Sequence, residues 1–144
     1  MIKPIQENDL VICANLLQEA YSKAPYNESF VGDNAYKYIL EKYNNCKNSS
    51  FVFLDDENKI QGFIFLRIST WSNGPQAILE EIVVNPLKQT LGIGKELMKY
   101  SRDYLDSLGV ESVMLWAKND ERLLNFYKKQ GFDIANDFSI MFKN

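Results

Sequence analysis

The apolar segment at residues 77–85 is followed at once by Pro86, which has no N–H to donate to a strand ladder. The segment therefore predicts a strand that ends at this proline. A short turn containing Gly92 and Gly94 comes next, and apolar residues then recur at helical spacing until Gly109, where a left-handed helix end is expected. A strand, a glycine-containing turn and a long helix in this order are typical of a mixed α/β fold.

The same two periodicities predict the remaining elements. Strands are expected at residues 2–5, 51–54, 60–68, 113–117, 132–134 and 138–142, and helices at 13–21, 35–43 and 120–130. The predicted order is β-α-α-β-β-β-α-β-α-β-β, which describes an α/β fold with a mixed sheet.

Composition limits the size of the chain and the classes of partner. The 144 residues, 46% of them hydrophobic, suffice for one domain with a buried core, and no repeat or linker divides them. We therefore expect a single domain over residues 1–144. A formal charge of −3 argues against binding to nucleic acid or to an anionic membrane, because both attract basic surfaces.

The chain contains no histidine, which excludes imidazole-based nucleophilic catalysis and histidine-ligated metal sites. Proton transfer is left to Asp, Glu, Tyr, Lys, Cys or water. Cys13 and Cys46 form no C-x-x-C motif, and we expect ordinary reduced thiols. No apolar run is long enough for a signal peptide or a membrane span, so we expect a cytoplasmic protein.

The turn before the long helix has the residue types of a phosphate-binding loop. It comprises Gln89, Thr90, Leu91, Gly92, Ile93, Gly94 and Lys95. Glycine lets the backbone approach a ligand closely, and the free N–H groups of a first helical turn attract anions such as a pyrophosphate. The loop is not a Walker motif, because Gln89 replaces its first glycine and Glu96 follows Lys95. The simpler alternative is a tight turn from loop to helix.

A second motif follows at residues 126–132, with the sequence F-Y-K-K-Q-G-F. Together with E-I-V-V-N-P at 81–86 and Q-T-L-G-I-G at 89–94, it resembles the signature of the GNAT superfamily of acetyl-CoA-dependent N-acetyltransferases. The detailed match covers about residues 77–134, and the predicted order of elements agrees over nearly the whole chain. The sequence P-Y-N-E at 25–28 resembles a substrate-side segment of small-molecule members, among them bacterial enzymes of the aminoglycoside type.

The resemblance implies a sheet that splays open after the fourth strand, with acetyl-CoA as co-substrate and no metal. The exposed strand backbone would pair with the pantetheine arm, and the loop N–H groups would hold the pyrophosphate. The cofactor-binding residues implied are Ile82, Val83, Val84, Gln89, Thr90, Leu91, Gly92, Ile93, Gly94, Lys95, Asn119, Leu123 and Tyr127. Thr90 replaces a glycine that is frequent in the family, so its N–H has to be reached past a side chain, which predicts a lower cofactor affinity. Leu123 replaces a small residue, which predicts a narrower cofactor groove.

The resemblance also implies catalytic roles in a direct attack of a neutral amine on the acetyl carbonyl. Glu81 is the first candidate for the general base, acting through water, and Tyr127 matches the family's general acid. Glu80 is the rival base, because neighbours in a strand point to opposite faces and a bulge can exchange them. The simpler alternatives are a core aromatic for Tyr127 and a solvated strand edge for the two glutamates.

The leading hypothesis is acetyl transfer to a primary amine of a cationic small molecule. The residues expected to bind this acceptor are Tyr26, Asn27, Glu28 and Trp71. One alternative is a protein or peptide N-acetyltransferase. Another is a noncatalytic module that senses acyl-CoA or binds a partner. A homodimer paired through residues 138–142 is compatible with the sequence.

Overall fold

The computed structural model describes all 144 residues, from Met1 to Asn144. Its strands are β1 (Ile2–Pro4), β2 (Ser50–Leu54), β3 (Ile60–Trp71), β4 (Gly74–Val84) and β5 (Val113–Leu115). Its α-helices are α1 (Leu10–Tyr21), α2 (Asn34–Asn45), α3 (Ile93–Ser107) and α4 (Glu121–Lys129). Two short 3-10 helices, η1 (Glu7–Asp9) and η2 (Pro86–Leu91), precede α1 and α3. The predicted order of elements is confirmed as far as α4.

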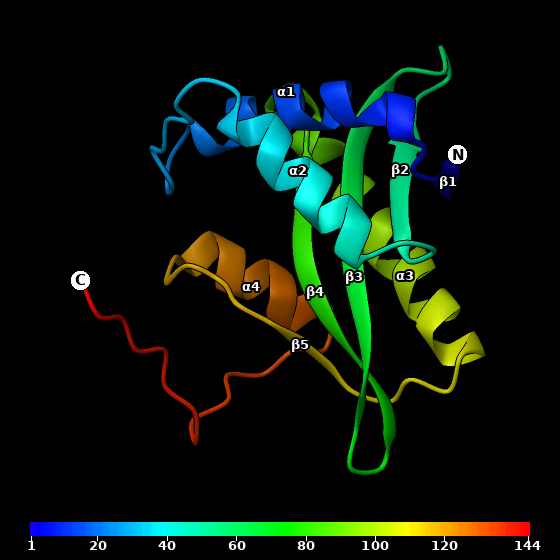
Figure 1. Ribbon diagram of the computed structural model, residues 1–144, viewed down its shortest axis with the longest axis vertical. Coiled ribbons are helices and arrows are strands. Elements are labelled where there is room, and N and C mark those ends of the chain that lie inside the picture. The colour runs from blue at the N-terminus through cyan, green and yellow to red at the C-terminus, as the bar shows by residue number, and fades with distance from the viewer.

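The five strands form one mixed sheet in the order β1-β2-β3-β4-β5. The pairs β1·β2, β2·β3 and β3·β4 are antiparallel, whereas β5 runs parallel to β4. Helices α1 and α2 cross one face of the sheet, α3 lies behind it, and the β3–β4 hairpin extends well beyond the helices (Figure 1). The α/β fold class is therefore confirmed.

The core has two layers, because β3 is buried on both faces. Phe63 and Phe65 pack in the cluster beneath α1 and α2, whereas Ile64 and Leu66 pack in the cluster beneath α3. Side chains alternate between the faces of a strand, and a central strand covered on both sides needs a continuous apolar run. The sequence F-I-F-L at 63–66 meets this requirement and fixes β3 at the centre of the sheet.

A β-bulge interrupts the pairing of β3 with β4 and changes which side chains share a face. Phe65 is paired with Glu81 and Leu66 with Leu79, so Glu80 has no partner of its own. A bulge of this kind adds one residue to one strand and shifts the alternation of side chains beyond it. As a result, both Glu80 and Glu81 lie on the face that α1 and α2 cover.

The two strands predicted at residues 132–134 and 138–142 are not formed, so this part of the prediction is wrong. Residues 133–144 are exposed, and the last backbone hydrogen bond of the chain runs from the Phe132 N–H to the Tyr127 carbonyl. Apolar alternation predicts side-chain burial, but a strand also needs a backbone edge to pair with. Strand β5 pairs over only three residues, which is fewer than the five predicted, and the sheet ends there.

Two smaller expectations concern the cysteines and the membrane. Cys13 and Cys46 are both free and buried. None of the helices has the length and apolar character needed to cross a bilayer.

Candidate active site

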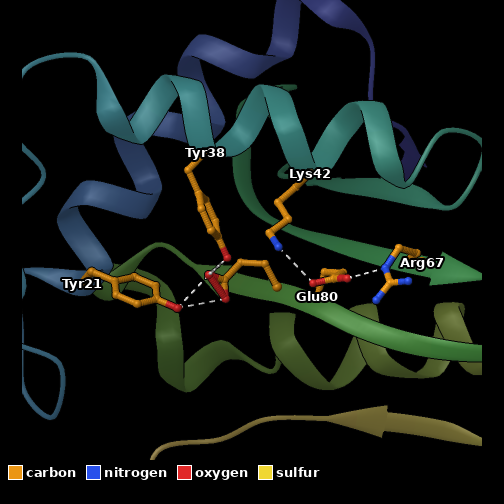
Figure 2. Close-up of polar contacts among 6 residues, drawn as sticks. Tyr21, Tyr38, Lys42, Arg67 and Glu80 are labelled. Atoms are coloured by element: carbon orange, nitrogen blue, oxygen red, sulfur yellow. Dashed lines mark hydrogen bonds and ion pairs between the residues drawn. The ribbon is translucent and has the colours of Figure 1, made fainter. Parts of the chain in front are cut away.

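Glu81 is a buried carboxylate on the central strand β4, with 9% of its surface exposed. The Tyr21 hydroxyl, at the end of α1, lies 2.7 Å from Glu81 Oε1 and 3.0 Å from Oε2. The Tyr38 hydroxyl, on α2, donates to Oε1 over 3.3 Å (Figure 2). A buried carboxylate needs such donors, because it has lost its hydration. Two helices therefore fix the orientation of one strand side chain.

The surroundings of Glu81 place its ionisation near neutral pH. Burial raises its pKa from an ordinary value of 4.5 to about 7, and the nearby Glu80 charge adds to this rise. The hydroxyls of Tyr21 and Tyr38 and the charge of Lys42 favour the ionised form and limit the rise. A carboxylate with this pKa is half ionised at neutral pH, which suits a general base.

Glu80, the neighbouring carboxylate, has a different environment. It accepts from Lys42 Nζ over 3.0 Å and from Arg67 Nε over 2.6 Å (Figure 2). Desolvation alone would raise its pKa, but the two cations outweigh it and lower the pKa below the ordinary value. Glu80 is therefore an ionised group between two cations, and of the two candidates Glu81 has the pKa of a base.

Tyr127 lies on α4, where its ring packs against Phe126 and Phe132. Burial raises the pKa of its phenol, and the electrostatic influence of Tyr26 and Glu81 raises this pKa further. Tyr26 in turn stacks on Tyr21, with ring centroids 4.3 Å apart. A phenol with a raised pKa keeps its proton at neutral pH and is able to donate it.

The cofactor side of the site begins where β5 leaves β4. The two strands pair only at Ala77, Ile78 and Leu79 of β4, so the following residues up to Val84 have no strand partner on that edge. Backbone N–H and C=O groups left unpaired at an edge are able to bind an extended amide-rich ligand by strand addition. The expected splay after the fourth strand is thus present.

The predicted phosphate loop leads directly into the N-terminus of α3. Gly92 has a φ of 83° and forms the N-terminal cap of α3, without any side-chain cap. The first helical hydrogen bond there is donated by the Glu96 N–H to the Gly92 carbonyl. The N–H groups before Glu96 have no partner within the helix and attract a negative charge.

Gly94 brings the two sequence motifs into contact. A Cβ atom at this position would lie 3.3 Å from Cζ of Phe126 on α4 and 3.6 Å from Cγ2 of Val84 on β4. The absence of a side chain therefore lets α4 approach the first turn of α3. In this chain the contact joins the Q-T-L-G-I-G segment to the F-Y-K-K-Q-G-F segment.

The remaining predicted cofactor residues surround this loop or α4. Gln89, Thr90, Leu91, Lys95 and Asn119 are exposed, whereas the Ile93 side chain is buried in the core, so only its backbone faces the loop. Leu123 is half-buried in the first turn of α4. Asp120 caps that helix as expected, since its side chain accepts from the Leu123 N–H over 3.1 Å.

The predicted acceptor residues are only partly brought together. Tyr26 contacts Tyr21 and lies at the site, with exposed Asn27 and Glu28 next to it in the loop after α1. Trp71 lies elsewhere: it is 71% exposed at the tip of the β3–β4 hairpin. This is six residues along β3 from Phe65, the partner of Glu81, or roughly 20 Å.

Four residues that contact the glutamates are absent from the sequence prediction of the site. They are Tyr21, Tyr38, Lys42 and Arg67. The useful signal was a carboxylate within an apolar strand, since a carboxylate buried beneath helices requires hydrogen-bond donors from them. Tyr21 and Tyr38 occupy core-facing helical positions and carry such donors.

A cavity of about 390 Å³ lies on the opposite face of the sheet, beneath α3. Ser101, Leu66 and Leu79 are among the residues that line it, and the buried Ser101 hydroxyl has no hydrogen-bond partner. Because the sheet separates this cavity from Glu81, it is not part of the site around that carboxylate.

The sequence matches one family model and several curated proteins. A family model described as "Acetyltransferase (GNAT) family" matches residues 12–132. An uncharacterized ycf52-like N-acetyltransferase of Prochlorococcus marinus is 37% identical over 59 residues, which are 41% of this chain and 32% of that protein. The mycothiol acetyltransferase of Renibacterium salmoninarum is 35% identical over 82 residues, 55% of this chain and 24% of that protein. The matches thus span between about a quarter and a third of these two curated relatives.

Solved structures with low sequence identity share the fold. A transcriptional regulator from Bacillus halodurans has a TM-score of 0.78 at 17% identity, with 99% of both chains covered. An aminoglycoside acetyltransferase from an uncultured soil metagenomic sample, in complex with trehalose, has a TM-score of 0.73 at 23% identity. The match covers 100% of this chain and 95% of that one. At these identities the likeness extends to the fold alone.

Proposed function

This chain belongs to the GNAT family of acetyltransferases, and we propose that it moves an acetyl group from acetyl-CoA to a primary amine. The observation that carries the proposal is the Glu81 carboxylate, which two tyrosines orient beside the splayed part of β4. Such a base supplies a group that accepts the proton of the acceptor amine. The sequence favoured a cationic small molecule as the acceptor. Of these properties, acetyl transfer itself requires only the primary amine, which is the nucleophile.

Glu81 acts as the general base. An alkylamine has a pKa near 10.4 and arrives protonated at neutral pH, so it loses a proton before it attacks the acetyl carbonyl. With its own pKa raised to about 7, Glu81 is ionised often enough to accept that proton, through a water molecule. Tyr21 and Tyr38 hold the carboxylate in place during the transfer.

Tyr127 acts as the general acid. When the C–S bond of the acetyl donor breaks, the sulfur leaves more readily if it receives a proton. The Tyr127 phenol keeps its proton at neutral pH, because burial and the neighbouring Tyr26 and Glu81 raise its pKa. Proton removal at Glu81 and proton delivery at Tyr127 are then carried out by two different side chains.

The chain offers two features that fit acetyl-CoA. Residues 80–84 of β4 present an unpaired backbone edge for the amide-rich arm, and the α3 N-terminus presents free N–H groups for the pyrophosphate. Exposed Lys95 lies in the same first turn and adds a positive charge. These groups bind and orient the donor, while the chemistry of the thioester belongs to the donor itself.

The test is to titrate the protein with acetyl-CoA by calorimetry and then to measure CoA release with a panel of primary amines. We expect saturable binding and an acetylated product, detected by mass, in amounts equal to the CoA released. Glu81→Gln should bind acetyl-CoA like the wild type and transfer slowly. Binding without transfer to any amine would replace the proposal with a noncatalytic acyl-CoA-binding module.

A further inference from the structure

One of the two cations that hold Glu80 has an unused binding edge. Arg67 contacts Glu80 through Nε over 2.6 Å (Figure 2), and its terminal guanidinium nitrogens donate no hydrogen bond within the chain. The Arg67 side chain is 41% exposed, whereas the Glu80 side chain is 16% exposed. The free edge of a guanidinium carries parallel N–H donors that match a carboxylate. Arg67 is thus held in place by Glu80 and remains accessible to a ligand.

The charges around Glu81 favour an acceptor with no net charge. The two carboxylates, Glu80 and Glu81, face two cations, Lys42 and Arg67, so the ionised group is neutral. Lys42 is 23% exposed and also lies 5.1 Å from the centre of the Tyr38 ring, which fixes it between the helices and the strand. A purely cationic amine would add an uncompensated charge to this half-buried group, which costs free energy. An ammonium group accompanied by one carboxylate would not.

The strand register gives only the backbone scale of the acceptor, because Glu81 and Arg67 are about two residues apart along the sheet. Arg67 is two residues along β3 from Phe65, and Phe65 is paired with Glu81. Two residues of a strand span about 7 Å. Two residues of an extended peptide span the same distance, which separates the amine of a dipeptide from its carboxylate.

The geometry points to an acceptor that is a primary amine with a carboxylate about two residue lengths away, as in a dipeptide. The amine lies beside Glu81, with the bridging water molecule between them, and the carboxylate binds the Arg67 guanidinium. This inference rests on the proposed acetyl transfer and adds the class of its substrate. A phosphate in place of the carboxylate fits less well, because its charge of about −1.5 to −2 would leave the site negative.

The experiment compares glycylglycine with glycylglycinamide as acceptors. Both have the same amine, and only the first has a carboxylate. We expect kcat/KM for the acid to exceed that for the amide by about tenfold or more, since a charge-assisted hydrogen bond is worth that factor. Arg67→Gln should remove this preference, and Arg67→Lys, which keeps the charge but not the fork, should retain part of it. Lys99→Gln, an exposed cation paired with Asp103 on α3, is the matched control and should leave the preference unchanged.

Each other outcome overturns the inference in a distinguishable way. Equal rates for the acid and the amide would remove the carboxylate site and leave acetyl transfer intact. Transfer to putrescine, but to neither dipeptide compound, would show a cationic acceptor and again leave the proposed function intact. A failure to bind acetyl-CoA and to acetylate any amine would overturn both proposals together.

Discussion

Glu80 and Glu81 are adjacent in the chain, yet both side chains lie on the face of β4 that α1 and α2 cover. The bulge opposite Phe65 and Leu66 causes this, because it inserts Glu80 as an extra residue. Two carboxylates then share one surface with opposite properties. Glu80 is ionised between Lys42 and Arg67, and Glu81 has a pKa near neutrality. Because their environments separate the two pKa values, Glu80 suits charge pairing and Glu81 suits proton transfer.

The first prediction concerns the pH dependence of acetyl transfer. A general base works only when it is deprotonated, so kcat/KM of the wild type should fall as the pH drops below about 7, the pKa of Glu81. Glu81→Gln should lower kcat about 100-fold or more and abolish this acidic limb. Steady-state rates between pH 5 and 9 test this, with Glu57→Gln, an exposed side chain, as the control. An acidic limb that persists in Glu81→Gln would assign the base to another group.

The second prediction concerns stability, which Glu81 should reduce at high pH. Its pKa is higher in the folded chain than in the unfolded chain, so the folded state binds the extra proton between pH 4.5 and about 7. Stability therefore falls as the pH rises through this window, by up to about 3 kcal/mol. Glu81→Gln should be more stable than the wild type above pH 7 and similar to it near pH 4. Chemical denaturation at both pH values measures this, and an equal difference at both would contradict it.

The third prediction separates the two tyrosines that contact Glu81. Tyr21 donates at 2.7 Å and Tyr38 at 3.3 Å, so loss of the Tyr21 hydroxyl should remove more stabilisation of the ionised carboxylate. Tyr21→Phe should move the acidic limb of the pH profile up by about one pH unit, and Tyr38→Phe should move it less. Tyr36→Phe, on the exposed side of α2, is the control. A loss of rate without any movement of the limb would indicate a purely structural role.

The fourth prediction concerns Tyr127 as the proton donor to sulfur. Tyr127→Phe keeps the ring contacts with Phe126 and Phe132 but lacks the hydroxyl, so kcat should fall about 100-fold while acetyl-CoA still binds. The defect should shrink with acetyl thioesters of more acidic thiols, because such leaving groups need less protonation. Tyr100→Phe, on α3, serves as the control. Turnover by Tyr127→Phe equal to that of the wild type would leave this tyrosine as a core aromatic.

Local signals predicted the fold well, because they depend on residues close in the chain. Gly109 adopts a φ of 73° just after α3, and the Asp120 side chain caps α4, both as expected. Contacts between residues far apart in the chain were harder to predict from the sequence. The hydrogen bond from Tyr21 to Glu81 joins residues 60 positions apart, and it exists only because α1 ends over the bulge in β4. The absent strands at 132–134 and 138–142 fail for a similar reason, since side-chain pattern does not supply a pairing edge.

The final prediction uses the contact between Gly94 and Phe126, which joins the two family motifs. Gly94→Ala places a Cβ atom 3.3 Å from Phe126 Cζ, so we expect the Phe126 ring, and α4 with it, to shift slightly away from α3. The free N–H groups of the α3 turn and the α4 side of the groove would then lie further apart, and acetyl-CoA affinity, measured by calorimetry, should fall about tenfold. Gly94→Ala combined with Phe126→Leu restores the space and should recover most of the affinity.

Gly92→Ala is a useful contrast, since no atom lies within 4 Å of its Cβ and only the positive φ is strained. That variant should lose about 1 kcal/mol of stability, and combining it with Phe126→Leu should recover none of it. If Phe126→Leu rescues neither or both glycine variants, the two motifs are not coupled through this contact.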